Sequence, residues 1–165
     1  MVTTKRTGGK MMSSLFQMKR TVLIVFSLLL LLSTSLWAQF PEGFESGAIP
    51  ETWTVHNVDG NANQFIAYNA GANAYEGSWV ARVSWNAAGN NDWLVTPALS
   101  ITSLAKTVKF WARSTSDYYS ESFNIKLSTT GAAVDNFTIN LGSFQDIPNA
   151  WTEYIVNLED YIGDT

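Results

Sequence analysis

The stretch Ser122-Phe123-Asn124-Ile125-Lys126-Leu127-Ser128-Thr129 decides the fold class, because apolar and polar side chains alternate along it. In an extended strand Phe123, Ile125 and Leu127 face one side, and the polar residues between them face the other. Residues 153–158 repeat the pattern. One apolar face and one polar face is typical of an antiparallel sheet that packs on a partner.

Further short runs rich in aromatic and β-branched residues lie between clusters of Gly, Asn, Asp, Pro and Ser. This composition favours strands and turns over helices, and it predicts an all-β protein with an antiparallel β-sandwich or jelly roll. The expected strands are 53–57, 64–68, 78–85, 92–96, 107–113, 122–129, 137–141 and 151–158. The expected core residues are Trp93, Leu94, Phe110, Phe123, Ile125, Leu127, Val156 and Leu158.

The first 38 residues have the composition of a leader rather than of this domain. Met18-Lys19-Arg20 is followed by the apolar run 21–32 and by small residues that end at Ala38. This order is typical of a helical signal peptide cleaved after Ala38, and residues 1–17 are interpreted as an upstream extension. A retained anchor is the alternative, although the run is shorter than the roughly 20 residues that a spanning helix needs. The predicted domain is therefore 39–165.

Charge and cysteine content restrict the function classes. The whole chain has a formal net charge of −4 and no cysteine. All five basic residues of the leader leave on cleavage, which brings the mature charge to about −9. An acidic domain is a poor match for nucleic acid or an anionic membrane surface. Without disulfides, stability is expected to come from the core and from bound metal.

The chain ends in the turn-like sequence Tyr161-Ile162-Gly163-Asp164-Thr165. A turn at this point is expected to lead into another strand. A sandwich without that strand would expose an unpaired edge. The sequence therefore predicts a domain truncated before its last strand, within a larger multidomain chain.

Several stretches, in order along the chain, resemble one family. They are Phe40-Pro41-Glu42-Gly43-Phe44-Glu45-Ser46-Gly47 with the following Pro50 and Trp53, then Asn91-Asp92-Trp93-Leu94-Val95-Thr96-Pro97, Val108–Arg113, Leu127–Gly131 and Trp151–Gly163. The chain is similar to the cleaved-adhesin domain and to the related choice-of-anchor J domain, itself similar to MAM domains. Phe65 stands where these families often have Trp.

The resemblance implies a jelly-roll module, often calcium-bearing, of secreted and cell-surface proteins of Bacteroidota such as gingipains and haemagglutinins. Such modules bind host proteins, glycans or haem-containing proteins, or they space other domains, and they do not catalyse.

The residues themselves also argue against an enzyme. His56 is the single histidine, it has no cysteine partner, and no nucleophilic serine flanked by glycines stands near it in the sequence. A structural role is the simpler interpretation. The acidic pairs Glu42 with Glu45 and Asp59 with Asp92 have no fixed separation that would indicate a glycosidase.

Calcium is the better hypothesis for the acidic and amide side chains near the strand ends. Calcium binds six to eight oxygen atoms from carboxylates, amides and the backbone. The candidate ligands are Glu45, Asp59, Asn61, Asn63 and Asp92, and the resemblance favours Glu45 somewhat. For residues 59–63, an Asx-rich turn whose side chains bond their own backbone is an equally good interpretation.

Aromatic residues supply the candidate ligand surface. Tyr118 and Tyr119 lie in the polar turn 114–120, where burial of both rings is not expected. Exposed aromatics on a loop suit sugar rings and protein anchors, although ordinary loop packing is the alternative. Trp85 begins a second candidate surface. The tryptophans within the strand patterns, among them Trp111 and Trp151, are expected mostly in the core.

Two hypotheses for function follow. The first is a secreted or cell-surface, non-catalytic adhesion module whose partners are host or surface proteins or glycans. The second is an accessory domain of an exported hydrolase, such as a peptidase, whose catalytic domain lies outside this sequence. In neither case is a nucleic acid or, after cleavage, a membrane the expected partner.

The leader generates the first testable prediction. Export should remove the chain up to Ala38, because the order of charge, apolar run and small residues matches a signal peptidase substrate. N-terminal sequencing of the secreted protein should start at Gln39 or within a residue or two of it. Recovery of the run 22–32 in the mature product would contradict this.

Overall fold

The computed structural model describes residues 40–164. The leader, its predicted cleavage after Ala38 and the start of the predicted domain at Gln39 lie outside the described residues. The chain divides into two compact units, Met1–Glu42 and Gly43–Thr165, and the fold below is that of the second. In the described residues no helix is long and apolar enough to cross a membrane.

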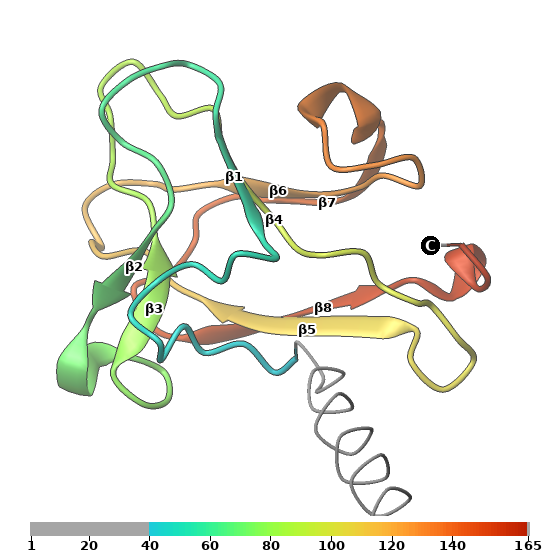
Figure 1. Cartoon of the computed structure of the whole chain (residues 1–165). Helices are drawn as coiled ribbons and strands as arrows, with labels where there is room; N and C mark the ends of the chain where they lie inside the picture. The colour runs from blue at the N-terminus through green and yellow to red at the C-terminus, as the bar shows by residue number, and fades with distance from the viewer. Residues whose placement is uncertain (1–39, 165) are drawn as a thin grey trace, which may run out of the picture. The chain divides into compact units, whose positions relative to one another are not determined.

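The described part of the chain is built from short strands and turns, which confirms the all-β fold class (Figure 1). Each of the expected runs overlaps one observed strand, although β2 and β7 extend beyond the predicted bounds, and the observed strands hold four to six residues. Their bounds are β1 Thr54–Asn57, β2 Ile66–Asn69, β3 Trp79–Arg82, β4 Asp92–Val95, β5 Thr107–Ala112, β6 Phe123–Leu127, β7 Ile139–Phe144 and β8 Thr152–Asn157. Single 3-10 turns lie at Gly71–Asn73, Val134–Asn136 and Glu159–Tyr161.

The strands pair into four antiparallel two-stranded ribbons, β1–β4, β2–β3, β5–β8 and β6–β7. Two of these ribbons join strands that are far apart in sequence, namely β1 with β4 and β5 with β8. In Figure 1 β5 and β8 run side by side, as do β6 and β7. The expected antiparallel packing is therefore present as ribbons that face one another.

The alternation seen in the sequence reappears as alternating burial. Side chains of β5, β6 and β8 switch between inner and outer positions at every residue. On β8 the two neighbours Ile155 and Val156 differ sharply, with 54% of Ile155 exposed and 5% of Val156. Successive side chains of a strand point to opposite faces, so one face of each ribbon is free to pack.

An aromatic cluster joins the β5–β8 ribbon to the β6–β7 ribbon. Phe110 of β5 stacks on Tyr154 of β8 with ring centroids 5.4 Å apart, and it meets Phe123 of β6 edge-on at 5.8 Å. Phe144 of β7 completes the cluster, 5.0 Å from Tyr154 and 5.1 Å from Phe123. These spacings are those of favourable offset and edge-to-face aromatic pairs.

A glycine makes room for this cluster. A Cβ atom on Gly142 would lie 2.8 Å from the ring of Phe144, closer than side chains can approach. Gly142 pairs with Ile125 across the β6–β7 ladder, next to the irregular step between Ile125 and Lys126. The absent side chain therefore lets the Phe144 ring lie over its own strand.

An aliphatic cluster continues the core toward the end of β8. Ile101, Val156 and Leu158 are buried together. The partly buried residues packed against them are Val108, Phe110, Ile125, Leu141 and Tyr161. The expected core residues Phe110, Ile125, Val156 and Leu158 thus lie where the sequence predicts.

The β1–β4 ribbon differs from the prediction. Trp93 and Leu94 are adjacent in β4, so they face opposite sides and cannot share one core. The buried residue of this strand is Val95. Trp93 lies on the same face as Val95, is half-buried and packs against Phe137 with ring centroids 5.6 Å apart, whereas Leu94 lies on the opposite face.

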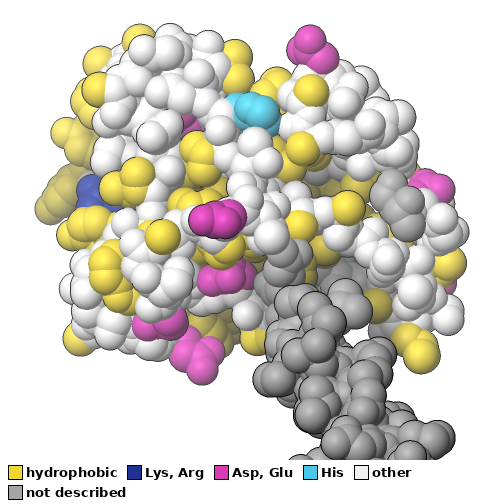
Figure 2. All heavy atoms as spheres, viewed as in Figure 1, with side chains coloured by type: hydrophobic (Ala, Val, Ile, Leu, Met, Phe, Trp, Pro, Cys, Tyr) yellow, Lys and Arg dark blue, Asp and Glu magenta, His cyan; other side chains and the backbone are white. Residues whose placement is uncertain are grey.

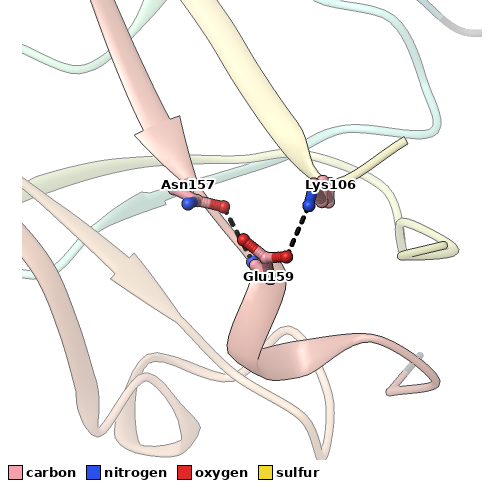
Figure 3. Close-up of polar contacts among 3 residues, drawn as sticks. All are labelled: Lys106, Asn157 and Glu159. Atoms are coloured by element: carbon pink, nitrogen blue, oxygen red, sulfur yellow. Dashed lines mark hydrogen bonds and ion pairs between the residues drawn. The ribbon is translucent and has the colours of Figure 1, made fainter. Parts of the chain in front are cut away.

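Polar contacts fasten the end of β8 to the start of β5 (Figure 3). The Lys106 ammonium pairs with the Glu159 carboxylate at 2.5 Å, and the Glu159 backbone N–H donates to the Asn157 side-chain oxygen at 2.9 Å. The hydrogen bond and charge of Lys106 lower the pKa of Glu159. Because this pair is exposed, the backbone bond from Leu158 to the Lys106 carbonyl, at 2.7 Å, is the firmer link.

The aromatic cluster generates the second prediction. Phe110→Ala should lower the free energy of unfolding by about 3–5 kcal/mol, because it leaves a cavity between two ribbons. The matched control is Ile155→Ala on the outer face of the paired strand, for which a loss of about 0.5 kcal/mol is expected. Urea unfolding monitored by circular dichroism measures both. Equal losses for the two variants would mean that the faces are misassigned.

Candidate functional site

Asp59 and Asp92 come together because β1 and β4 pair. The ladder places Asn57 opposite Asp92, so the loop that follows β1 starts beside this aspartate. The Asp59 carboxylate accepts a hydrogen bond from the backbone N–H of Asn91 at 2.7 Å. Two carboxylates from distant parts of the sequence therefore share one strand end.

Asp92 is the least satisfied polar side chain of this region. Both of its carboxylate oxygens are buried and have no hydrogen-bond partner. Burial, and then the negative charge of Asp59, raise the pKa of Asp92 above its ordinary value of 3.8. A buried carboxylate without donors is costly unless it is protonated or paired with a cation.

The loop after β1 forms the Asx turns that were one interpretation of its sequence. The Asp59 carboxylate accepts from the N–H of Asn61 at 3.1 Å, and the Asn61 side chain accepts from the N–H of Asn63 at 2.6 Å. The Asn57 side chain accepts from Gly60 in the same way. These bonds engage residues 59–63 in local structure, but they do not reach Asp92.

Glu45 belongs to a different neighbourhood. One of its carboxylate oxygens accepts from the backbone N–H groups of Ser78 and Trp79, both at 2.9 Å. A Cβ atom on Gly77, whose φ is +64°, would lie 2.3 Å from that oxygen. Glycine at position 77 thus allows Glu45 to bind the start of β3 from the segment before β1.

The carboxylates do not gather into a large acidic cage. Within residues 40–164 no group of three or more His, Cys, Asp or Glu side chains is placed to hold a metal ion. Asp59 and Asp92 remain the close pair. The two unpartnered oxygens of Asp92 are the observation that fits a cation, whereas the Glu45 oxygen described above already accepts two backbone hydrogen bonds.

Tyr118 and Tyr119 line an open hollow of about 230 Å³. Tyr118 is 93% exposed and Tyr119 is 69% exposed, as the polar turn predicts. The remaining lining residues are Ser116, Asp117, Ser120, Asp146, Ile147, Pro148 and Asn149. The hollow is therefore formed by two loops, 116–120 after β5 and 146–149 before β8.

Backbone hydrogen bonds hold these two loops together. The N–H of Ser114 donates to the Pro148 carbonyl at 2.8 Å, and the N–H of Ile147 donates to the Glu121 carbonyl at 3.1 Å. Ser114 and Ile147 are both buried. The loop that carries the exposed tyrosines is therefore held in place by backbone hydrogen bonds at its two ends.

The sequence did not indicate that the loop 146–149 belongs to the candidate ligand surface. Asp146 and Asn149 carry a turn signal around Pro148, but no local pattern indicates that they meet residues about thirty positions earlier. That proximity follows from the pairing of β5 with β8 and of β6 with β7.

Trp85, the third ligand candidate, lies with the loop after β1. Its side chain is 67% exposed, and its carbonyl accepts a hydrogen bond from the Asn63 side chain at 3.1 Å. The side chain of Asn90 binds the neighbouring Ser84 carbonyl. Trp85 is thus an exposed ring on a loop that the Asx turns support.

Trp111 and Trp151 correct an expectation, because they pack outside the aromatic cluster. Trp111 occupies an outward position of β5, where Tyr75 stacks on it with ring centroids 4.1 Å apart. The Trp151 indole donates to the Asn73 carbonyl, and Arg113 lies over its ring. The loop 71–77 therefore covers these rings on the outer face.

His56 has a structural partner. Its Nε2 atom lies 2.8 Å from the Ala132 carbonyl. A carbonyl only accepts, so the histidine donates this hydrogen bond. The contact ties β1 to the loop that precedes β7, as expected for a structural histidine.

Taken together, the antiparallel ribbons and the packing between them define a β-sandwich domain with two exposed aromatic loop surfaces. The family model of the Cleaved Adhesin Domain matches residues 38–152, and the chain belongs to this family. Hemagglutinin A from Porphyromonas gingivalis is 29% identical over 111 residues, which make up 61% of this chain and 4% of that protein. The chain thus spans only a small part of this relative.

Solved structures agree with the fold. The K1 cleaved adhesin domain of Lys-gingipain from Porphyromonas gingivalis matches with a TM-score of 0.60 and 25% identity, over 71% of this chain and 79% of that one. The K3 domain of the same protein matches with a TM-score of 0.57 and 24% identity, over 71% and 78%. The family resemblance seen in the sequence is confirmed.

The raised pKa of Asp92 generates the third prediction. Because the folded state holds the Asp92 proton more tightly than the unfolded state, stability should fall as pH rises from about 4 through the folded pKa. Asp92→Asn should remove this part of the pH dependence. Thermal unfolding in chelator between pH 3 and pH 7 measures it. Parallel pH profiles for the two proteins would show that Asp92 titrates normally.

Proposed function

We propose that this chain is an adhesion module of an exported or cell-surface protein, which binds protein or glycan partners and catalyses no reaction. Membership of the cleaved adhesin family supports this proposal. The observation that carries it is the pair of exposed tyrosines at positions 118 and 119, on a loop whose flanks are hydrogen-bonded to the loop 146–149 and its neighbours.

Exposed aromatic rings suit attachment because they bury a large area at a small cost in conformational entropy. The charged groups of the surface are mostly acidic (Figure 2). Figure 2 shows acidic side chains spread over one face, with Lys or Arg visible at only one place on it. Such a surface disfavours polyanionic partners and leaves apolar and hydrogen-bonding contacts to give affinity.

The fourth prediction tests adhesion itself. The secreted protein should attach to fixed epithelial cells, and replacement of Tyr118 and Tyr119 together by Ser should reduce attachment about tenfold or more, as loss of aromatic anchors does. Ile155→Ser is the matched control, because it removes an exposed apolar residue from an outer strand face. Flow cytometry with labelled protein measures attachment. Undiminished attachment of the tyrosine variant would contradict a role for this loop.

We further propose that calcium binds beside Asp92 and Asp59. The two unpartnered, buried oxygens of Asp92 and the nearby charge of Asp59 suit a hard divalent cation. Oxygens from Asn61 and Asn63 would complete the ligand set if the Asx turns open toward the ion. A bound cation would supply the partner that the two buried oxygens of Asp92 lack, and it would stabilise the ends of β1 and β4.

Calcium gives the fifth prediction, in which the effect of Asp92→Asn on the melting temperature differs with and without the metal. Calcium should raise the melting temperature of the wild type, because the ion binds only the folded arrangement of ligands. Asp92→Asn should melt higher than the wild type in chelator, since it removes a buried charge, yet it should gain little from calcium. Differential scanning calorimetry compares the two conditions.

Two variants serve as controls for the calcium prediction. Asp135→Asn removes an exposed acid from a 3-10 turn and should leave the response to calcium unchanged. Glu45→Gln should also keep most of the response, because the contacts of Glu45 are with β3. A wild type that melts at one temperature in calcium and in chelator rules the site out.

A further inference from the structure

The hollow beside Tyr118 and Tyr119 combines two kinds of surface. The tyrosines supply exposed aromatic faces, and the opposite loop supplies the polar side chains of Asp146 and Asn149. A sugar ring has this same division, because its C–H groups form an apolar face and its hydroxyls lie around the edge. The chemistry of the hollow therefore matches a pyranose better than a purely apolar ligand.

Free hydrogen-bonding atoms remain at the polar side of the hollow. Asp146 uses one carboxylate oxygen to accept from the Ser120 hydroxyl at 2.5 Å, and Asp117 uses one to accept from the Asn149 amide at 3.3 Å. The second oxygen of each aspartate has no hydrogen bond to the described residues. These two oxygens can accept from sugar hydroxyls, as charged acceptors form the stronger hydrogen bonds.

The same contacts fix the geometry before a ligand arrives. The Tyr118 N–H donates to the Ser116 hydroxyl at 3.1 Å, and the buried Ser114 hydroxyl donates to the Ser116 carbonyl at 2.7 Å. Cross-loop bonds from Ser120 and Asn149 then hold the two aspartates. A site ordered in advance loses less conformational entropy on binding.

Size and charge narrow the ligand class. At about 230 Å³ the hollow is smaller than the roughly 300–1,000 Å³ of pockets that enclose drug-sized molecules, so it suits one ring rather than a whole oligosaccharide. Asp117 and Asp146 contribute negative charge, and no Lys or Arg is among the lining residues. Sialic acids, uronic acids and sulfated sugars would be repelled.

We propose that this hollow binds a single neutral sugar ring, such as the terminal hexose or N-acetylhexosamine of a glycan. The ring would stack on Tyr118 or Tyr119 and present hydroxyls to Asp117 and Asp146. This inference rests on the proposed adhesion function and names the class of ligand that one of its surfaces takes. One sugar ring binds weakly. Strong attachment would therefore require many such domains to bind many glycans at the same time.

Saturation-transfer NMR on the secreted protein tests the proposal directly. The probes are the methyl glycosides of glucose, galactose, mannose and N-acetylglucosamine, with N-acetylneuraminic acid and glucuronic acid as anionic counterparts. At least one neutral glycoside should bind with a millimolar Kd, as expected for so small a ligand. The anionic sugars should bind about tenfold more weakly or not at all.

Variants connect the binding to the hollow. Tyr118→Ala with Tyr119→Ala should weaken the neutral glycoside about tenfold, whereas the two Tyr→Phe changes should retain binding, because the phenyl face remains. Asp146→Asn keeps an acceptor for the Ser120 hydroxyl but removes a negative charge. It should therefore reduce the difference in Kd between neutral and anionic sugars. Ile155→Ala should change nothing. Absence of neutral-sugar binding, or full binding by the Tyr→Ala protein, overturns the proposal.

Cell attachment separates this proposal from the broader one. Epithelial cells treated with glycosidases should lose attachment of the wild type. Attachment that persists on treated cells and still depends on the two tyrosines would identify a protein partner; the sugar proposal would fail and the adhesion function would stand. Absence of attachment to untreated cells would count against the adhesion function, while the NMR result would still decide sugar binding.

Discussion

The contact between two aromatic pairs holds this domain together. Phe110 and Tyr154 stack within the β5–β8 ribbon, and Phe123 and Phe144 lie within the β6–β7 ribbon. No backbone ladder joins these ribbons, so side-chain packing must supply the attraction. Aromatic rings do this well because each buries a large area and their edges and faces attract. Because inner and outer side chains alternate along these strands, the four rings lie on the inner face of each ribbon.

The loop surfaces depend on that packing. Tyr118 and Asp146 belong to loops that follow β5 and precede β8, and they meet because the two ribbons are aligned. Asp59 and Asp92 meet for a similar reason, since the β1–β4 ladder brings two distant segments to one strand end. In both places strand pairing brings the loops together, and hydrogen bonds to side-chain carboxylates then fix their positions.

The sequence predicted the features that depend on period and composition. The strands were found because alternation and turn residues are local signals, and Val156 and Leu158 were correctly placed in the core. Tyr118 and Tyr119 were correctly expected to be exposed, because a polar turn cannot bury two rings. The family was recognised from ordered motifs that extend over most of the domain.

Features that depend on which strands pair were not predictable. Trp111 follows the inner residue Phe110, so alternation alone turns it outward, and only the structure shows that Tyr75 stacks on it there. Glu45 was grouped with Asp59 as a metal ligand, and only the structure shows its bonds to the start of β3. Asp146 and Asn149 carried no functional signal at all. Pairing is a long-range property, and turn chemistry does not encode it.

The division into separate ribbons has a mechanical consequence. A continuous sheet resists a pulling force through a row of hydrogen bonds that must break together, whereas these ribbons are joined to one another by packed rings and aliphatic side chains. Such contacts have no preferred direction and weaken steadily as water enters. A domain of this kind should therefore yield to tension by sliding its ribbons apart while each ribbon stays paired. In a tethered surface protein it would extend in steps under load and so limit the force on the tether.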